Sequence, residues 1–160
     1  MKICIIGNGL TSLVLAKNLA KKKIFVDIIY EHHHKESPSA RTIGITNDNF
    51  QFLKHLFPKI KNRSFSIKEI KVFNHNDLDN ALLNFSSKNM NQMYMFKYHE
   101  IYNHILKDIK KFKYLNKIKK KLKTLDLKNI SKKYDLIIDT NLQNKFSTKN
   151  FYKRIKKDYF

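Results

Sequence analysis

The N-terminal segment, residues 1–31, constrains the fold more than any other part of the chain. Residues 2–6 form a short apolar run typical of a strand that is buried on both faces. A glycine turn follows, then an apolar, alanine-containing helical pattern over residues 11–22, and then a second apolar run over residues 25–30. Strand, glycine turn, helix and strand in this order predict a βαβ unit, in which a crossover helix joins two parallel strands.

The turn and the tip of the second strand carry the residue types that a dinucleotide needs. Gly7 permits the tight turn out of the first strand, and Gly9 lets the backbone approach a pyrophosphate at the helix N-terminus. Glu31 lies 24 positions after Gly7, where its carboxylate can accept hydrogen bonds from a ribose diol. Ser12 replaces the third glycine of the G-x-G-x-x-G pattern, and we expect only a modest cost in helix–strand packing. The alternative is a βαβ unit without a ligand, which leaves the paired glycines and the acid as coincidences.

Length and composition favour one globular domain. The chain has 160 residues, of which 42% are hydrophobic, so it can bury a proper core. No apolar stretch reaches the roughly 18 residues that span a bilayer, and we expect no signal peptide because Met1 leads directly into the first strand. Cys4 is the only cysteine, which excludes an internal disulfide and makes a reducing cytoplasm the expected compartment.

The formal net charge of +20 suggests nucleic acid or an anionic membrane surface as a partner. However, the 33 basic residues include only three arginines, at positions 41, 63 and 154, and arginine is the residue that grips phosphates in a bidentate way. Asparagine and isoleucine are abundant, whereas glycine and proline are scarce, as in the products of AT-rich genomes. We therefore interpret most of the charge as compositional drift on solvated faces. We expect no specific nucleic-acid partner, and the charge does not indicate peripheral membrane contact.

Periodicity and turn residues predict the remaining elements. In the first half they are a polar loop over residues 32–39, a helix over 47–57 with Asn47 as its N-cap and Pro58 after it, a half-exposed strand over 67–74 and short strands over 82–85 and 93–96. In the second half they are a helix over 98–111, a strand over 113–116, an irregular hairpin over 117–133 and a buried strand over 134–139. Three consecutive histidines follow Glu31, but no Cys or Asp cluster completes a coordination shell, so we expect no metal site. No internal repeat or linker indicates a second domain.

The order of these features resembles the N-terminal FAD-binding part of flavin-dependent aromatic hydroxylases, especially those of ubiquinone biosynthesis. The glycine turn and Glu31 match the family's motif for the ADP half of FAD. The segment Arg41-Thr42-Ile43-Gly44-Ile45-Thr46 resembles a family segment whose arginine faces the flavin dinucleotide. Residues 93–106 resemble a strand and helix whose first polar residue touches FAD, and His99 is the nearest match.

A fourth match is the strand and turn YDLIIDTNLQNKFS over residues 134–147. In the family this strand ends in an Asp-Gly pair, whose positions are taken here by Asn141 and Leu142. Leucine tolerates positive φ poorly, so the turn and the flavin–NAD(P)H coupling associated with it are in question. The family also has a substrate-binding sheet and a later Gly-Asp motif, and its members run well over twice this length.

The resemblance implies an α/β fold class, namely a Rossmann-like FAD/NAD(P)-binding domain with a central parallel sheet, truncated and lacking most of the substrate domain. It implies that residues 1–146 form this domain, with partial substrate-side strands at about 67–96, and that residues 147–160 form a polar tail or short helix. It assigns no catalytic residue and no metal ligand. The candidate cofactor-binding residues are Gly7, Asn8, Gly9, Leu10, Thr11, Ser12, Glu31, Arg41 and His99.

The function that the resemblance implies is FAD-dependent hydroxylation of an aromatic ring of the ubiquinone-precursor type, with NAD(P)H as the reductant. For these 160 residues alone we expect weak or no FAD binding and no hydroxylation, so that other subunits or a C-terminal portion would be partners. Two alternatives remain open. One is an NAD(P)-binding oxidoreductase of similar fold, which Glu31 suits, and the other is a non-enzymatic basic module that binds nucleic acid or a membrane surface.

Overall fold

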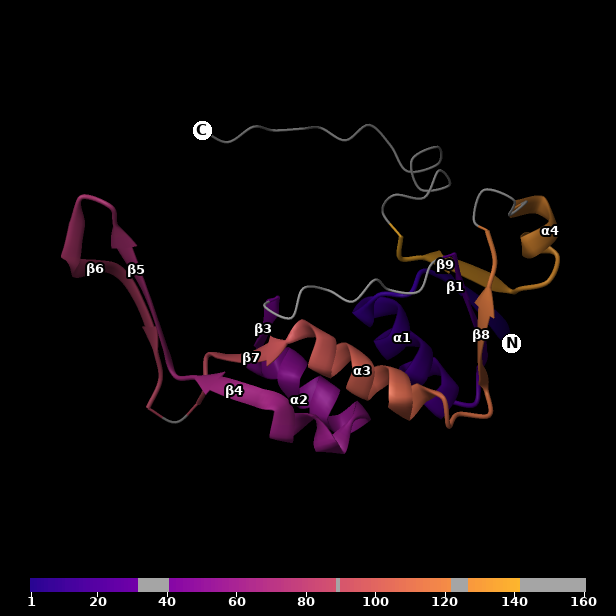
Figure 1. The fold of residues 1–160 in the computed structure, drawn as a ribbon, viewed down its shortest axis with the longest axis horizontal. Helices are drawn as coiled ribbons and strands as arrows, with labels where there is room; N and C mark the ends of the chain where they lie inside the picture. Colours follow the sequence, from indigo (N-terminus) through magenta and orange to yellow (C-terminus); the bar gives the residue numbers. More distant parts are fainter. Residues whose placement is uncertain (32–40, 89, 122–126, 142–160) are drawn as a thin grey trace. The chain divides into compact units, whose positions relative to one another are not determined.

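The computed structural model describes residues 1–31, 41–88, 90–121 and 127–141, and Figure 1 shows their arrangement. The chain divides into two compact units, each described here by itself. The first unit comprises Met1–His34 and Phe112–Phe160, and the second comprises Lys35–Lys111. No helix among the described residues is both long enough and apolar enough to cross a membrane.

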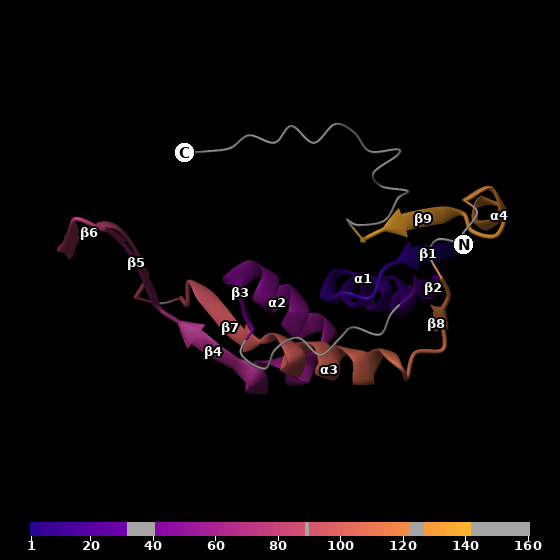
Figure 2. The same cartoon turned by 45° about the horizontal axis from the view of Figure 1, so that its top comes forward.

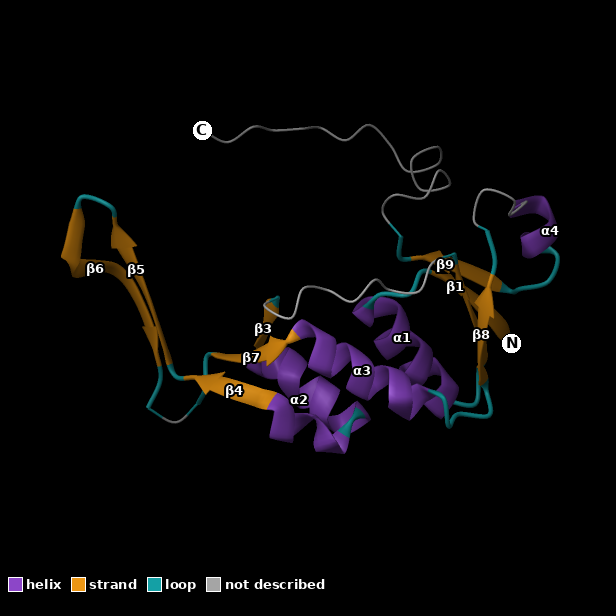
Figure 3. Ribbon diagram, viewed as in Figure 1, coloured by secondary structure: helices purple, strands orange, loops and turns teal. Residues whose placement is uncertain are grey.

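A four-stranded parallel sheet forms the centre of the first unit, with the strand order β8-β2-β1-β9. The helix α1 joins β1 to β2, and the short helix α4 precedes β9 (Figure 3). The predicted βαβ unit is therefore confirmed. The elements of the unit are β1 (Lys2–Ile6), α1 (Leu10–Lys21), β2 (Phe25–Tyr30), β8 (Leu115–Lys119), α4 (Leu127–Ser131) and β9 (Leu136–Asp139).

The sheet is buried on both faces at its centre, as the two apolar runs predict. Cys4 and Ile6 alternate along β1 with Ile3 and Ile5, so the two pairs face opposite sides, and all four are buried. The face with Cys4 packs against Ile130 of α4. The buried residues of α1 are Ser12, Leu13, Ala16, Lys17 and Ala20, whose spacing of three to four residues explains why this segment is a helix.

Three predictions for the first unit are wrong. The third parallel strand begins two residues later than expected and continues to Lys119, because its backbone pairs with β2 from Val26 to Tyr30. The hairpin expected over 117–133 is absent from the described part of that range, which contains the end of β8 and the helix α4. The last strand is not buried, since among the described residues β9 pairs with β1 alone, at the edge of the sheet, and Leu136 is 44% exposed.

The second unit contains a three-stranded antiparallel sheet, in the order β3-β7-β4, and a separate hairpin. The rings of Phe50 and Tyr94 stack with their centroids 3.6 Å apart, and Phe50, Phe96 and Ile105 are fully buried core residues. The elements of the unit are β3 (Thr42–Thr46), α2 (Asn47–Leu56), the 3₁₀ helix η1 (Pro58–Arg63), β4 (Ser64–Ile67), β5 (Glu69–Asn74), β6 (Asp77–Ser86), β7 (Met93–Lys97) and α3 (Tyr98–Ile109).

Here too the structure departs from the local pattern. The single strand expected over 67–74 is two strands, because β4 ends at Ile67 to pair with β7, whereas β5 begins at Glu69 to pair with β6. The strand expected over 82–85 is part of β6, which has ten residues. The N-cap of α2 is Thr46, and Asn47 is the first helical residue. Figure 2 shows the hairpin of β5 and β6, in which every residue of β6 is exposed.

Candidate functional site

The glycine turn between β1 and α1 has the backbone geometry that only glycine adopts easily. Gly7 has a φ of +132°, a region that residues with a side chain rarely enter. Its N–H donates to the carbonyl oxygen of Ile29 on β2 at 2.9 Å, which ties the turn to the neighbouring strand. A Cβ added at Gly7 would overlap the hydroxyl of Thr140. Glycine is therefore required here by conformation and by space.

The second glycine opens the helix N-terminus to a ligand. Gly9 is the N-cap of α1, and a Cβ added to it would find no atom within 4 Å. Among the described residues no side chain caps this end, and the first turn contains no acidic residue. The first N–H groups of a helix have no intrahelical acceptor and carry partial positive charge, so Leu10 and Thr11 present donors suited to a phosphate.

Asn8, between the two glycines, supplies an acceptor. In the described part of the chain its Oδ1 is buried and has no hydrogen-bond partner. Buried polar atoms almost always have a partner, so an orphaned acceptor in a turn lined with N–H donors fits a ligand that brings hydroxyl or amine donors of its own. The residues present therefore fit the phosphate and sugar part of a nucleotide.

Ser12, which replaces the third glycine, is fully buried and makes a polar contact that a glycine could not make. Its Oγ lies 2.7 Å from Oγ1 of Thr140, the residue directly after β9. The hydroxyl of Thr140 also donates to the carbonyl oxygen of Ile6 at 2.9 Å. The hydrogen bond to Thr140, at the end of β9, thus offsets part of the packing cost expected for serine at this position.

Glu31 lies directly after β2 and is partly buried. Strands β1 and β2 are parallel neighbours with Ile6 beside Ile29, so the glycine turn and Glu31 follow the carboxyl ends of adjacent strands. Ligands of open α/β sheets bind at this edge. The first unit therefore holds seven of the nine candidate residues, Gly7 to Ser12 and Glu31, on two consecutive strand ends.

The remaining candidates, Arg41 and His99, lie together in the second unit. The carbonyl oxygen of Arg41 accepts the N–H of Tyr98 at 2.8 Å, and its guanidinium carbon lies 4.6 Å from the centre of the Tyr98 ring. His99, the second residue of α3, has a buried Nδ1 that lacks a partner among the described residues. Its Nε2 lies 4.0 Å from Oε1 of Glu100. Burial raises the pKa of the Tyr98 hydroxyl, and the nearby Arg41 charge opposes this shift.

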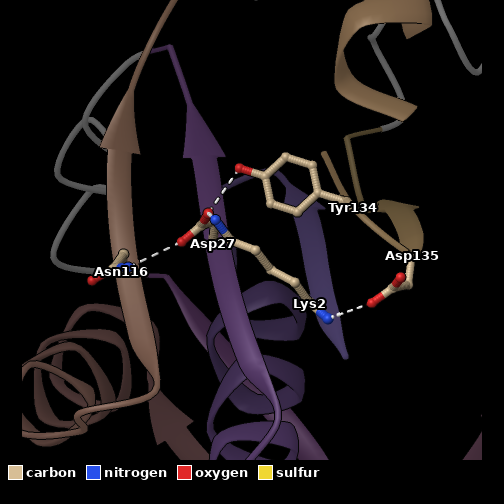
Figure 4. A network of polar contacts seen from close by, with 5 residues as sticks. All are labelled: Lys2, Asp27, Asn116, Tyr134 and Asp135. Carbon is tan, nitrogen blue, oxygen red and sulfur yellow. Dashed lines mark hydrogen bonds and ion pairs between the residues drawn. The ribbon is translucent and has the colours of Figure 1, made fainter. Parts of the chain in front are cut away.

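A buried carboxylate that the sequence reasoning did not single out lies on β2 (Figure 4). Asp27 Oδ2 is 2.9 Å from Lys2 Nζ and accepts the Tyr134 hydroxyl at 2.8 Å, while Oδ1 accepts Asn116 Nδ2 at 3.1 Å. Burial would raise the pKa of Asp27, but these hydrogen bonds and the Lys2 charge outweigh it and hold the pKa below its ordinary value. The backbone N–H of Lys2 donates to Asp135 at 2.7 Å. The network joins β8, β2, β1 and the segment before β9.

Cys4 and Tyr134 are poorly suited to act as nucleophiles, and the described residues contain no cluster that could hold a metal ion. Burial, followed by the charges of Asp27 and Asp139, raises the pKa of Cys4 to about 11, so its thiol stays protonated near neutral pH. Burial and the hydrogen bond to Asp27 also raise the pKa of Tyr134. In residues 1–31, 41–88, 90–121 and 127–141, no group of three or more His, Cys, Asp or Glu could hold a metal ion. The three consecutive histidines, the predicted tail and Leu142 lie outside the described residues.

Comparison with solved structures identifies the fold. The chain is similar to p-nitrophenol 4-monooxygenase PnpA from Pseudomonas putida (TM-score 0.59, 15% identity, 72% of this chain and 31% of that one). It is also similar to PqsL, a probable FAD-dependent monooxygenase from Pseudomonas aeruginosa (0.59, 12%, 74% and 32%), and to a variant of 2-methyl-3-hydroxypyridine-5-carboxylic acid oxygenase (0.58, 12%, 73% and 30%). The chain therefore has the Rossmann-like fold of FAD-dependent monooxygenases.

This monooxygenase fold accounts for the α/β class and the central parallel sheet that the sequence predicts. The chain spans about a third of the length of these solved structures. Neither a protein-family model nor a curated protein sequence matches it.

Sequence reasoning missed Thr140 and Asp27 within this fold. Thr140 could have been found from its place at the carboxyl end of a parallel strand, the edge where ligands bind. Asp27 left a weaker signal, a lone acid in the otherwise apolar run FVDIIY, because a charge on a buried strand needs partners.

Proposed function

We propose that the first unit binds FAD through the ADP half of the cofactor. The glycine turn and the N-terminus of α1 receive the pyrophosphate, and the carboxylate of Glu31 accepts hydrogen bonds from the adenosine ribose. The observation that carries the proposal is the combination of positive φ at Gly7, open space beside Gly9 and an uncapped helix end at the carboxyl edge of a parallel sheet. The orphaned acceptor of Asn8 supports it.

The finer proposal is that FAD serves a flavin monooxygenase reaction. When bound, the flavin supplies the redox and oxygen chemistry, with NAD(P)H as the reductant, and an aromatic ring of the ubiquinone-precursor type is the substrate that we propose. The similarity of the fold to PnpA and PqsL supports this reaction class. The further proposal that Arg41 and His99 contact the cofactor rests on the resemblance of their sequence segments to those of the flavin-dependent hydroxylases. Because the chain spans about a third of those structures, we propose that turnover needs additional polypeptide, either further sequence or another subunit.

Binding of FAD by the purified protein tests the proposal directly. Titration followed by quenching of flavin fluorescence should show weak but saturable binding that ADP competes away, because the proposed contacts are made by the ADP half alone. Gly9→Val should abolish binding while lowering the melting temperature only slightly, since a Cβ at Gly9 meets no described atom and the remaining cost is that of a poorer N-cap. Gly9→Ala is the graded control and should weaken binding less.

Two other results would redirect the assignment. If NAD displaces ADP and FAD does not bind, the unit is an NAD-binding domain of similar fold. If no nucleotide binds, and retention on heparin is salt-sensitive and unchanged by Gly9→Val, the protein is instead a basic module whose charge of +20 binds an anionic polymer or surface.

A further inference from the structure

We infer that Ser12 and Thr140 form a hydroxyl clamp that positions the pyrophosphate-binding turn, and this inference rests on the proposed binding of FAD. The clamp consists of these two side chains and the carbonyl oxygen of Ile6. It joins the end of β1 and the first turn of α1 to the end of β9, where Thr140 lies 128 positions after Ser12 and 134 positions after Ile6. All three belong to the first unit.

Thr140 and Ser12 each carry one hydroxyl proton, and this determines which of them donates in each hydrogen bond. Thr140 donates its single hydroxyl proton to the carbonyl oxygen of Ile6 at 2.9 Å, since a carbonyl can only accept. At the 2.7 Å contact Thr140 must then accept, so the Ser12 hydroxyl is the donor. The backbone N–H of Thr140 donates to the same Ile6 oxygen at 2.9 Å. Thr140 therefore makes two hydrogen bonds to the carbonyl oxygen of Ile6, at the end of β1, and one to Ser12 in α1.

The clamp also explains the requirement for glycine at position 7. A Cβ there would overlap Oγ1 of Thr140 and lie 3.1 Å from Oγ of Ser12, so the two hydroxyls fill the space beside the turn. In the usual pattern the third glycine lets the helix pack closely on the strand. Here the helix is held by a directed hydrogen bond instead. Because Ser12 is in the first turn of α1, the bond fixes the N–H groups that would face the pyrophosphate.

Thr140→Val is the decisive variant because valine keeps the shape of threonine and removes the hydroxyl. We expect it to weaken FAD binding about fivefold to tenfold, the equivalent of about one lost hydrogen bond. Thr140→Ser keeps the hydroxyl and should bind within about twofold of the parent protein. Ser12→Ala should weaken binding by itself but add nothing to Thr140→Val, because both remove the same interaction.

A control and a second measurement make the outcome clear. Ser64→Ala removes a hydroxyl hydrogen bond in the second unit, from Ser64 Oγ to the carbonyl oxygen of Lys61 at 2.9 Å. This bond is exposed, and its loss should leave FAD binding unchanged. Amide hydrogen exchange of the peptide covering residues 7–13, measured without FAD, should accelerate in Thr140→Val and not in Ser64→Ala. If Thr140→Val does not fold, Ser12→Ala is measured in its place, because it leaves the Thr140–Ile6 bond intact.

Three results are distinguishable. Weaker FAD binding together with faster exchange supports the clamp. Unchanged FAD affinity in folded Thr140→Val and Ser12→Ala overturns it, even if the melting temperature falls, since the pair would then serve stability alone. If the parent protein binds no FAD, the proposed function fails, and the exchange result alone decides whether the two hydroxyls hold the turn.

Discussion

Replacing Asp27 by asparagine tests whether the buried carboxylate holds the parallel sheet together. The amide has nearly the same size but no charge, and it places N–H groups where donors already approach. We expect a loss of about 3 kcal/mol in unfolding free energy, because one to two charge-assisted hydrogen bonds at about 1.5–3 kcal/mol each disappear. Lys2 adds little to this loss because its side chain is 49% exposed and water solvates it. For a chain of this size the melting temperature should fall by about 6–12 °C.

The effect of Asp27→Asn should depend on pH in a defined direction. The pKa of Asp27 is lowered in the folded state, so the unfolded chain binds the proton more readily and acid favours unfolding. The stability that the carboxylate contributes is complete above the ordinary aspartate pKa of about 3.9 and is lost as the pH falls through the lower folded value. The difference between the parent protein and Asp27→Asn should therefore be constant from neutral pH to about pH 5 and shrink below about pH 4.

Urea and thermal denaturation, followed by circular dichroism across this pH range, measure both effects. Asp79→Asn is the matched control, since Asp79 is exposed on the hairpin and should change stability by less than about 0.5 kcal/mol. Tyr134→Phe removes one donor to Asp27 and should cost about 1–2 kcal/mol. A loss below about 1 kcal/mol for Asp27→Asn, or one that stays constant down to pH 3, would refute the reasoning.

Three further results are expected from the described residues. Gly7→Ala should destabilise the protein by about 1–3 kcal/mol in thermal melts because of its positive φ. Gly9→Ala should cost less, about 0.5–1 kcal/mol, because Gly9 is an extended N-cap and alanine is only a poorer capping residue. The thiol of Cys4, buried and with a pKa of about 11, should resist maleimide at pH 7 in the folded protein and react at once in urea. Leu83 and Phe85 on β6 are 54% and 51% exposed, so replacing both by threonine should reduce binding of the dye ANS without lowering the melting temperature.

Sequence patterns correctly predicted the strands and the helix that short stretches of neighbouring residues are sufficient to specify. The apolar runs of residues 2–6 and 25–30 gave the two central strands with their observed bounds, because a strand buried on both faces needs an unbroken apolar sequence. The helix that begins at Tyr98 was predicted by its apolar spacing. The prediction put the strand Leu115–Lys119 too early in the chain, because its sequence LNKIK carries two lysines and is not an apolar run. Backbone pairing with β2 decides where this strand begins and ends.

The amphipathic hairpin shows a second limit of local reading. Ile70 lies opposite Phe85 and Val72 opposite Leu83, so these four side chains share one face. Glu69, Lys71 and Asn84 share the other. Alternation of this kind predicts a half-buried strand, but most of the apolar face is exposed. Periodicity specifies which side chains share a face, and only the tertiary structure decides whether anything covers that face.

The sequence by itself determined the βαβ unit, the glycine turn and the acid at the end of the second strand, because a few adjacent residues encode each of them. Only the tertiary structure placed Thr140 beside Gly7 and Ser12, and only it surrounded Asp27 with Lys2, Asn116 and Tyr134. The same Thr140 hydroxyl also donates to the carbonyl oxygen of Ile6, 134 positions away. The geometry of these contacts depends on strand order and register, β8-β2-β1-β9, which the pairing of backbones across the sheet establishes and no local pattern records.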